Sequence, residues 1–81
     1  MASVYQPLGA YLARQPGPTV TLPFREVEAI LARPLPPGAR TNRAWWDNYH
    51  ARTHAYHGWL AVGWRSEGVD LARQVVTFRQ S

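Results

Sequence analysis

RTNRAWWDNYHARTHAYHGWLAVGWR, residues Arg40 to Arg65, is the stretch that decides how this chain folds. It holds all four tryptophans, all three histidines and four of the nine arginines of the 81-residue chain. Large side chains of these types build cores or form binding surfaces. Because so many of them lie in about a third of the sequence, we expect this stretch to serve both purposes.

Length and composition restrict the class of protein. At 81 residues the chain is expected to form one domain, residues 1–81. The lack of cysteine excludes disulfides, thiolate zinc sites and cysteine nucleophiles, and it fits a reducing cytoplasm. No apolar run approaches the ~20 residues of a membrane-spanning helix. We therefore expect a cytoplasmic protein with no membrane partner.

All of the basic charge comes from arginine. Nine arginines, no lysine and five acidic residues give a net charge of +4. A GC-rich genome would produce this bias. Selection for guanidinium groups that hold phosphates and guanine edges would produce it as well. Both explanations stay open, and a small basic domain is consistent with a polyanionic partner.

The segments before this stretch predict short regular elements. Residues 7–15 have the apolar spacing of a helix, and the prolines and glycine of residues 16–18 end it. Residues 19–22 alternate as a strand. Residues 24–33 have one apolar face and predict a second helix. Residues 34–40 are rich in proline and predict a rigid, irregular connection.

The remaining residues predict a third helix and a hairpin. Residues 54–64 have a broad apolar helical surface, with Thr53 as the N-cap. Residues 69–71 and 75–79 alternate as two strands joined by a turn at residues 72–74. The core is expected to contain Phe24, Val27, Ile30, Leu31, Trp59, Leu60, Val62, Val69, Leu71, Val76 and Phe78. Trp45 and Trp46 are adjacent, so one is expected inside and the other partly exposed.

This order of elements predicts an α+β fold like that of a winged helix-turn-helix protein. It has three helices and a three-stranded antiparallel sheet, in which the first strand pairs with a C-terminal hairpin that forms the wing. The third helix would be the recognition helix. The connection before it is much longer than a normal helix-turn-helix turn, so it would be an inserted loop.

Several short motifs carry a family resemblance along nearly the whole chain. They are Pro7-Leu8 with Tyr11-Leu12, the Phe24 to Leu31 segment, Arg43-Ala44-Trp45-Trp46 with Asn48, Trp59-Leu60 with Gly63-Trp64, and Val69-Asp70-Leu71 with Val76, Phe78 and Arg79. The chain resembles a small bacterial domain family of unknown function. The resemblance implies a defined structural unit, and it brings no established activity.

Arg40, Arg43, Trp46 and Asn48 form the most suggestive cluster, together with Trp45. In a complex with nucleic acid, arginine would hold phosphate, tryptophan would stack on a base or sugar, and asparagine would read adenine. The alternative is structural. The tryptophans would belong to the core, and the arginines would stack on them or pair with Glu26 or Glu28.

The histidines and the outer arginines extend this hypothesis. His50, His54 and His57 have the spacing of one helical stripe, which would face a DNA groove, bind zinc or lie in solvent. Arg52 would extend a basic face, and Arg73 sits where a wing would touch a phosphate or a minor groove.

We therefore expect a non-catalytic domain that binds nucleic acid, with duplex DNA as the first expectation. The predicted contacts are Arg40, Arg43, Trp46, Asn48, Arg52, His54, His57 and Arg73. No nucleophile elbow, phosphate-binding glycine loop or paired-carboxylate motif is visible, so we expect no cofactor and no metal. The rival hypothesis is a protein-interaction module that docks through exposed Trp, Tyr and Arg. A homodimer is compatible with either hypothesis.

Overall fold

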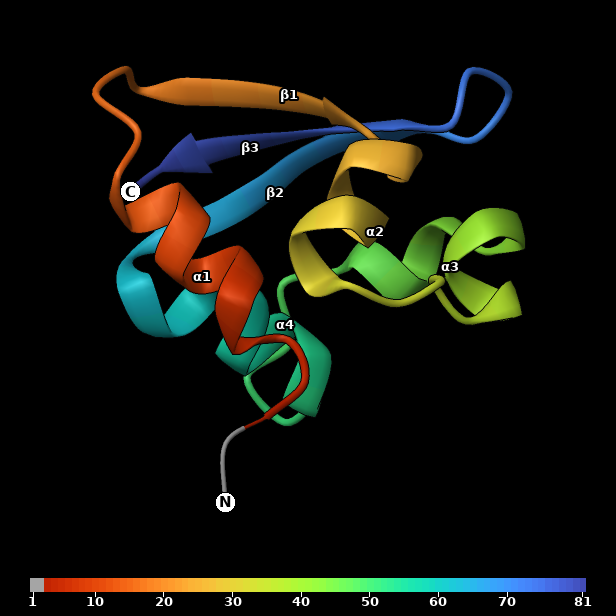
Figure 1. The fold of residues 1–81 in the computed structure, drawn as a ribbon, viewed down its shortest axis with the longest axis horizontal. Helices are drawn as coiled ribbons and strands as arrows, with labels where there is room; N and C mark the ends of the chain where they lie inside the picture. Colours follow the sequence, from red (N-terminus) through yellow and green to blue (C-terminus); the bar gives the residue numbers. More distant parts are fainter. Residues whose placement is uncertain (1–2) are drawn as a thin grey trace.

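The computed structural model describes residues 3–81, which form four α-helices, two 3₁₀ helices and a three-stranded antiparallel sheet (Figure 1). In chain order they are α1 (Gln6–Ala13), β1 (Thr19–Pro23), α2 (Phe24–Leu31), α3 (Pro37–Thr41), η1 (Arg43–Trp46), α4 (Thr53–Gly58), η2 (Leu60–Val62), β2 (Trp64–Asp70) and β3 (Val75–Gln80). The expected α+β class with an antiparallel sheet is confirmed. The expected number of three helices is wrong.

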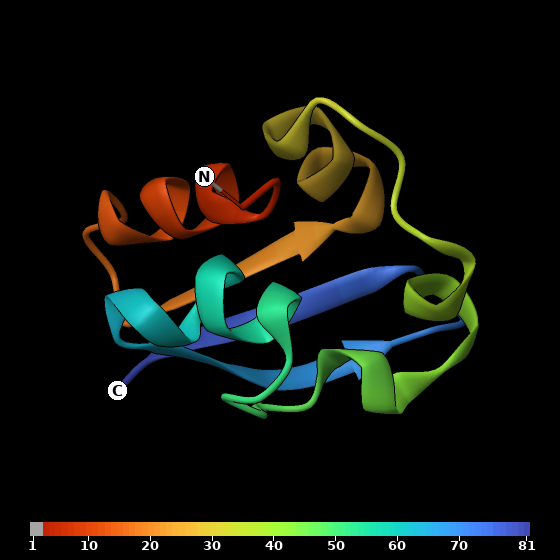
Figure 2. The same ribbon diagram turned by 90° about the horizontal axis from the view of Figure 1, so that it is seen from below.

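The described residues form two layers, because the helices lie on one face of the sheet and no part of residues 3–81 covers the other face (Figure 1). The strand order is β1-β3-β2, so the last strand lies in the middle. Viewed from the helical side, α1 and α2 lie along the β1 side of the sheet, and α4 lies across the β2 and β3 side (Figure 2). The inner face is apolar. On the outer face the Thr21 and Thr77 hydroxyls hydrogen-bond at 2.9 Å.

α2 begins and ends where its sequence predicts. Pro23 before it is extended, and Glu26 lies in the first turn, where the helix dipole favours an acid. At the other end Ala32 adopts a left-handed conformation with φ 58°, and Pro34 follows. The helix buries Phe24, Val27 and Leu31 against the sheet. This element therefore follows from local sequence signals.

The proline-rich connection after α2 is more regular than expected. Pro37 occupies the first turn of α3, where a missing N–H group costs nothing and a fixed φ favours the helix. Ala39 on this short helix is fully buried. The prediction of an irregular segment from residue 34 to 40 is therefore wrong for its second half, because prolines at a helix start do not interrupt it.

The third helix is much shorter than the predicted span of residues 54–64. α4 ends at Gly58, η2 adds one tight turn, and Gly63 has φ 82°, a left-handed conformation that stops any continuation. β2 then begins at Trp64, so the hairpin is longer than expected. Val62, predicted to lie in the core, is 39% exposed because the helix ends before it.

The core consists of apolar side chains from every layer. Trp46 is at its centre, with its ring centroid 5.1 Å from that of Phe24 and 6.0 Å from that of Trp59. Trp59 is fully buried and packs at 5.2 Å on Phe78. Most of the predicted core is confirmed, although Ile30, Leu60 and Leu71 are only partly buried. Within residues 3–81 no helix is long and apolar enough to cross a membrane.

Candidate binding surface

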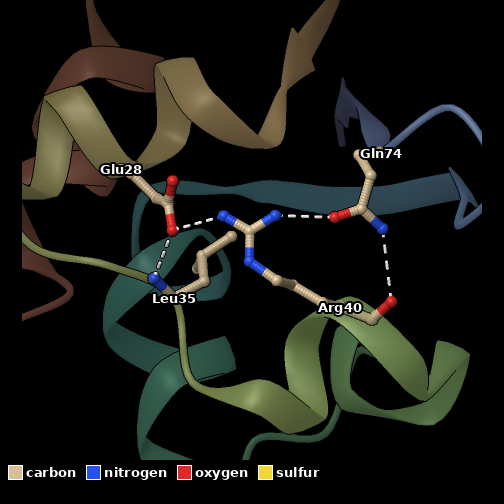
Figure 3. A network of polar contacts seen from close by, with 4 residues as sticks. All are labelled: Glu28, Leu35, Arg40 and Gln74. Atoms are coloured by element: carbon tan, nitrogen blue, oxygen red, sulfur yellow. Dashed lines mark hydrogen bonds and ion pairs between the residues drawn. The ribbon is translucent and has the colours of Figure 1, made fainter.

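The side chain of Arg40, which lies on α3, is held by residues of α2 and of the hairpin turn (Figure 3). Its Nη2 donates to Glu28 Oε2 at 2.6 Å and its Nη1 donates to Gln74 Oε1 at 2.6 Å. Glu28 Oε2 also accepts the Leu35 N–H at 2.7 Å. This N–H and the Arg40 guanidinium lower the pKa of the Glu28 carboxyl below its ordinary value. The alternative in which Arg40 pairs with Glu28 is therefore confirmed.

Trp46 and Arg43 lie on η1, which packs beside β2. Trp46 is 2% exposed, and its Nε1 donates to the carbonyl of Ala39 at 2.8 Å. Its indole belongs to the core and has no exposed face on which a nucleic-acid base could stack. The predicted role of Trp46 as a nucleic-acid contact is therefore not supported by its position. Arg43 is exposed, and its Nη1 donates to the carbonyl of Val69 at 2.7 Å. Within residues 3–81 this bond uses one of its five N–H groups, and the guanidinium keeps further donors.

Asn48 is a structural bridge between three parts of the chain. Its Oδ1 accepts from Trp59 Nε1 at 2.9 Å and from the Ser66 N–H at 2.8 Å. Its Nδ2 donates to the Ser66 carbonyl at 3.0 Å. The amide thus offers the edge of β2 the same pair of bonds that a neighbouring strand would. These bonds leave little of the amide for reading a base.

His54 is held against Trp45. The two rings stack with centroids 3.9 Å apart at an angle of 5°, and His54 Nε2–H donates to the Trp45 carbonyl at 2.6 Å. Burial of the imidazole lowers its pKa, and the charge of Arg52 acts in the same direction. The neutral form is therefore favoured. Trp45 is half-buried and Trp46 is buried, so the prediction that one of the two faces inward is confirmed.

The side chains that do face solvent come from the end of the loop and from α4. We call them the 49–57 surface. Its members are Tyr49, His50, Arg52, Tyr56 and His57. The two tyrosines are 57% and 42% exposed. The Arg52 guanidinium carbon lies 5.3 Å above the Tyr49 ring, and its Nη1 donates to the Ala44 carbonyl at 2.6 Å. Arginine and aromatic rings are thus presented together.

The predicted histidine stripe is divided by the structure. His50 lies in the turn before α4, His54 is turned inward on Trp45, and His57 is partly buried beside Tyr56 at 5.1 Å. Among residues 3–81 there is no group of three histidine or acidic side chains arranged to hold a metal ion. Tyr56 on α4 is 42% exposed, and its ring centroid lies 6.2 Å from that of His50.

Arg73 lies in the hairpin turn, as predicted. Its side chain is 83% exposed, and its backbone N–H donates to Asp70 Oδ1 at 3.0 Å. The Arg73 Nε is 3.9 Å from Asp70 Oδ2. At that exposure the ion pair leaves the guanidinium free to bind other anions.

An open pocket of about 390 Å³ lies at the edge of β2. Arg43, Asp47, Tyr49 and Glu67 are among its lining residues. Glu67 is paired with Arg79, and Asp47 and Arg43 add one charge of each sign, so the lining selects neither a cation nor an anion. Tyr49 belongs both to this lining and to the 49–57 surface.

One comparison with known proteins gave a match. A family model described as Domain of unknown function (DUF7662) matches residues 5–81. The chain belongs to the DUF7662 family. The match contains every helix and strand described above, and it confirms the resemblance to a small domain family of unknown function. No curated protein and no solved structure matches the chain.

Proposed function

We propose that the chain is a cytoplasmic, non-catalytic domain of winged-helix type that binds nucleic acid, with duplex DNA as its target. One observation carries the proposal. The 49–57 surface presents Arg52 over the ring of the exposed Tyr49, with a second exposed tyrosine, Tyr56, on α4, in a domain with a net charge of +4. Guanidinium groups beside aromatic rings suit a phosphate backbone and its sugars.

The arrangement of elements supports this type of fold. β1 lies between the first two helices in sequence and pairs with β3, and the β2–β3 hairpin follows the last helix. In a winged-helix protein the helix before the hairpin is presented to the DNA groove and the hairpin turn touches its flank. Here those positions are occupied by α4 and Arg73. Because α4 has only six residues, the loop residues before it would share the contact.

The contact set is smaller than the sequence predicts. Arg40, Trp46, Asn48 and His54 are occupied within the chain. Their role is to hold the loop in place. Arg43, Arg52 and Arg73 keep solvent-facing guanidinium groups, and we assign them to phosphate. His57 and Tyr49 would lie beside the backbone or a groove.

A titration of a fluorescent random-sequence duplex, followed by anisotropy at several salt concentrations, tests the proposal. If three arginines neutralise phosphates, log K should fall with log salt at a slope of about −2 to −3. We expect micromolar binding at low salt, and a parallel titration with an RNA duplex tests the preference for DNA. No binding at low salt contradicts the proposal.

A second candidate function is a protein-docking module. The observation that favours it is the exposure of Tyr49 and Tyr56, because tyrosine and arginine dominate interface hot spots. An interface with aromatic anchors should change little with salt, whereas phosphate binding should weaken steeply. The same salt series therefore separates the two candidates.

A further inference from the structure

The two edges of the sheet are treated differently by the rest of the chain. The β2 edge is occupied, because the Asn48 amide bonds both the N–H and the C=O of Ser66, and Arg43 bonds the C=O of Val69. Side chains thus take the place of a fourth strand. No side chain of residues 3–81 bonds the open backbone N–H groups of β1 in this way.

The pairing of β1 with β3 shows which backbone groups are free. The Gln80 N–H donates to the Pro18 carbonyl at 2.8 Å and the Phe24 N–H donates to the Gln74 carbonyl at 2.7 Å. In an antiparallel ladder, inward and outward residues alternate, so Thr19 and Thr21 direct their N–H and C=O groups away from β3. Within residues 3–81 neither of these N–H groups has a hydrogen-bond partner.

The β1 edge has only part of the usual protection against pairing. Natural edge strands are blocked by charged side chains, proline, short length, bulges or a covering segment, and β1 has five residues with one proline at its end. The sequence Thr19–Pro23 carries no charge, and its register with β3 is unbroken. Pro23 removes one donor from the edge but leaves its carbonyl as an acceptor. The helices lie below the sheet, so a strand added beside β1 would continue the sheet above them (Figure 1).

We propose that two copies of the chain pair through β1, antiparallel about a two-fold axis at Thr21, and form one continuous six-stranded sheet. In this register Thr21 lies opposite Thr21 of the second copy, and Thr19 lies opposite Pro23. Each free N–H group of Thr19 and Thr21 then meets a free carbonyl. Pro23 has no N–H, so the Thr19 carbonyl opposite it gains no partner, and the pairing has four backbone bonds.

The edge fits a second copy better than an unrelated peptide. Strand addition gains affinity from backbone bonds and specificity from side-chain pockets. Both described pockets lie elsewhere, one beside β2 and one between α1, α4 and η2. The β1 edge therefore has little means to select a foreign side chain. Its free donors and acceptors match those of an identical strand, and an uncharged strand avoids repulsion between two copies of charge +4.

Sedimentation equilibrium of the full chain tests this dimer. The concentration series should extend to about 1 mM, because an interface of this size belongs to the weak class. The Thr21→Pro variant removes the central N–H without removing a bond to β3, and Thr21→Val is its matched control because it loses only the hydroxyl. Thr21→Lys places two like charges at the axis and leaves the backbone intact.

We expect the wild type and Thr21→Val to form dimers with similar affinity. Thr21→Pro should dimerise at least about tenfold more weakly, since the two central bonds are lost. Thr21→Lys should also be weaker, with partial recovery in high salt. Circular dichroism shows whether each variant is folded. If Thr21→Pro is unfolded, the dimer affinity of Thr21→Lys relative to the wild type tests the proposal. The proposal is overturned by a wild type that stays monomeric, by folded Pro and Lys variants that dimerise normally, or by a folded Val variant that does not. The dimer does not depend on nucleic-acid binding, so the two proposals fail separately.

Discussion

Residues 40–48 and residues 49–57 are neighbours with similar side chains and opposite environments. In the first segment Arg40, Trp46 and Asn48 direct their polar groups to partners in the same chain. In the second segment Tyr49 and Tyr56 are exposed. Both segments are rich in the residue types that recognise nucleic acids and proteins.

The difference between them lies in the partners that the fold supplies. Glu28 is placed by α2 opposite Arg40, and the edge of β2 is placed opposite Asn48. Among residues 3–81 the Tyr56 side chain makes no hydrogen bond, and its ring lies beside the imidazoles of His50 and His57. Residue type alone therefore does not separate a structural arginine or asparagine from a binding one. The following changes test this comparison, from the largest effect to the smallest.

Replacing Trp46 by alanine should have the largest effect in the first segment. The indole is buried among Phe24, Trp59 and Phe78, and the loss of a buried tryptophan costs about 3–5 kcal/mol. For a domain of this size that is enough to unfold much of the protein. Urea unfolding measures the loss. The control is Trp45→Ala, which removes a half-buried neighbour and should cost less. Equal costs would contradict the inward assignment of Trp46.

Replacing Asn48 by alanine should have an intermediate effect. It leaves the Trp59 indole N–H and the Ser66 backbone without partners, which should lower the free energy of unfolding by about 2 kcal/mol. Asn48→Asp keeps the accepting oxygens and loses the bond to the Ser66 carbonyl, so its loss should be smaller. An alanine variant of normal stability that loses DNA affinity would instead place Asn48 in the binding surface.

The pH dependence of stability should report the pair of Arg40 and Glu28. The Leu35 N–H and the Arg40 guanidinium lower the pKa of folded Glu28 below its ordinary value of 4.5. Below pH 4.5 the unfolded chain therefore binds the proton first, and stability falls as the pH drops through the lowered pKa. Because both side chains are partly exposed, the effect should be the smallest of the three. Urea unfolding between pH 6 and about pH 3 should show a weaker pH dependence for Glu28→Gln. An identical dependence would contradict the pairing.

The fold could be predicted where local signals act alone. α1, β1 and α2 follow from apolar spacing and from the prolines around them, and the hairpin follows from alternation. The start of α4 agrees with the predicted span to within one residue, but its end at Gly58 could not be predicted, because glycine is compatible with a helix until tertiary packing stops it. The site could be predicted only as a region. The sequence does not predict which of its side chains are hydrogen-bonded within the fold, because their partners Glu28, Gln74 and Ser66 are distant in sequence.

The measurement that tests the central claim most directly is the DNA titration at low salt with one variant from each segment. Arg52→Ala with Tyr56→Ala removes side chains from the outward segment, and Arg40→Ala removes an arginine from the inward segment. We predict that the unfolding free energy of the double variant stays within about 0.5 kcal/mol of the wild-type value. We predict that the same variant loses most of its affinity for DNA. Arg40→Ala should lose stability and, where folded, still bind. A stable Arg40→Ala variant that fails to bind, beside a double variant that binds normally, would contradict these predictions.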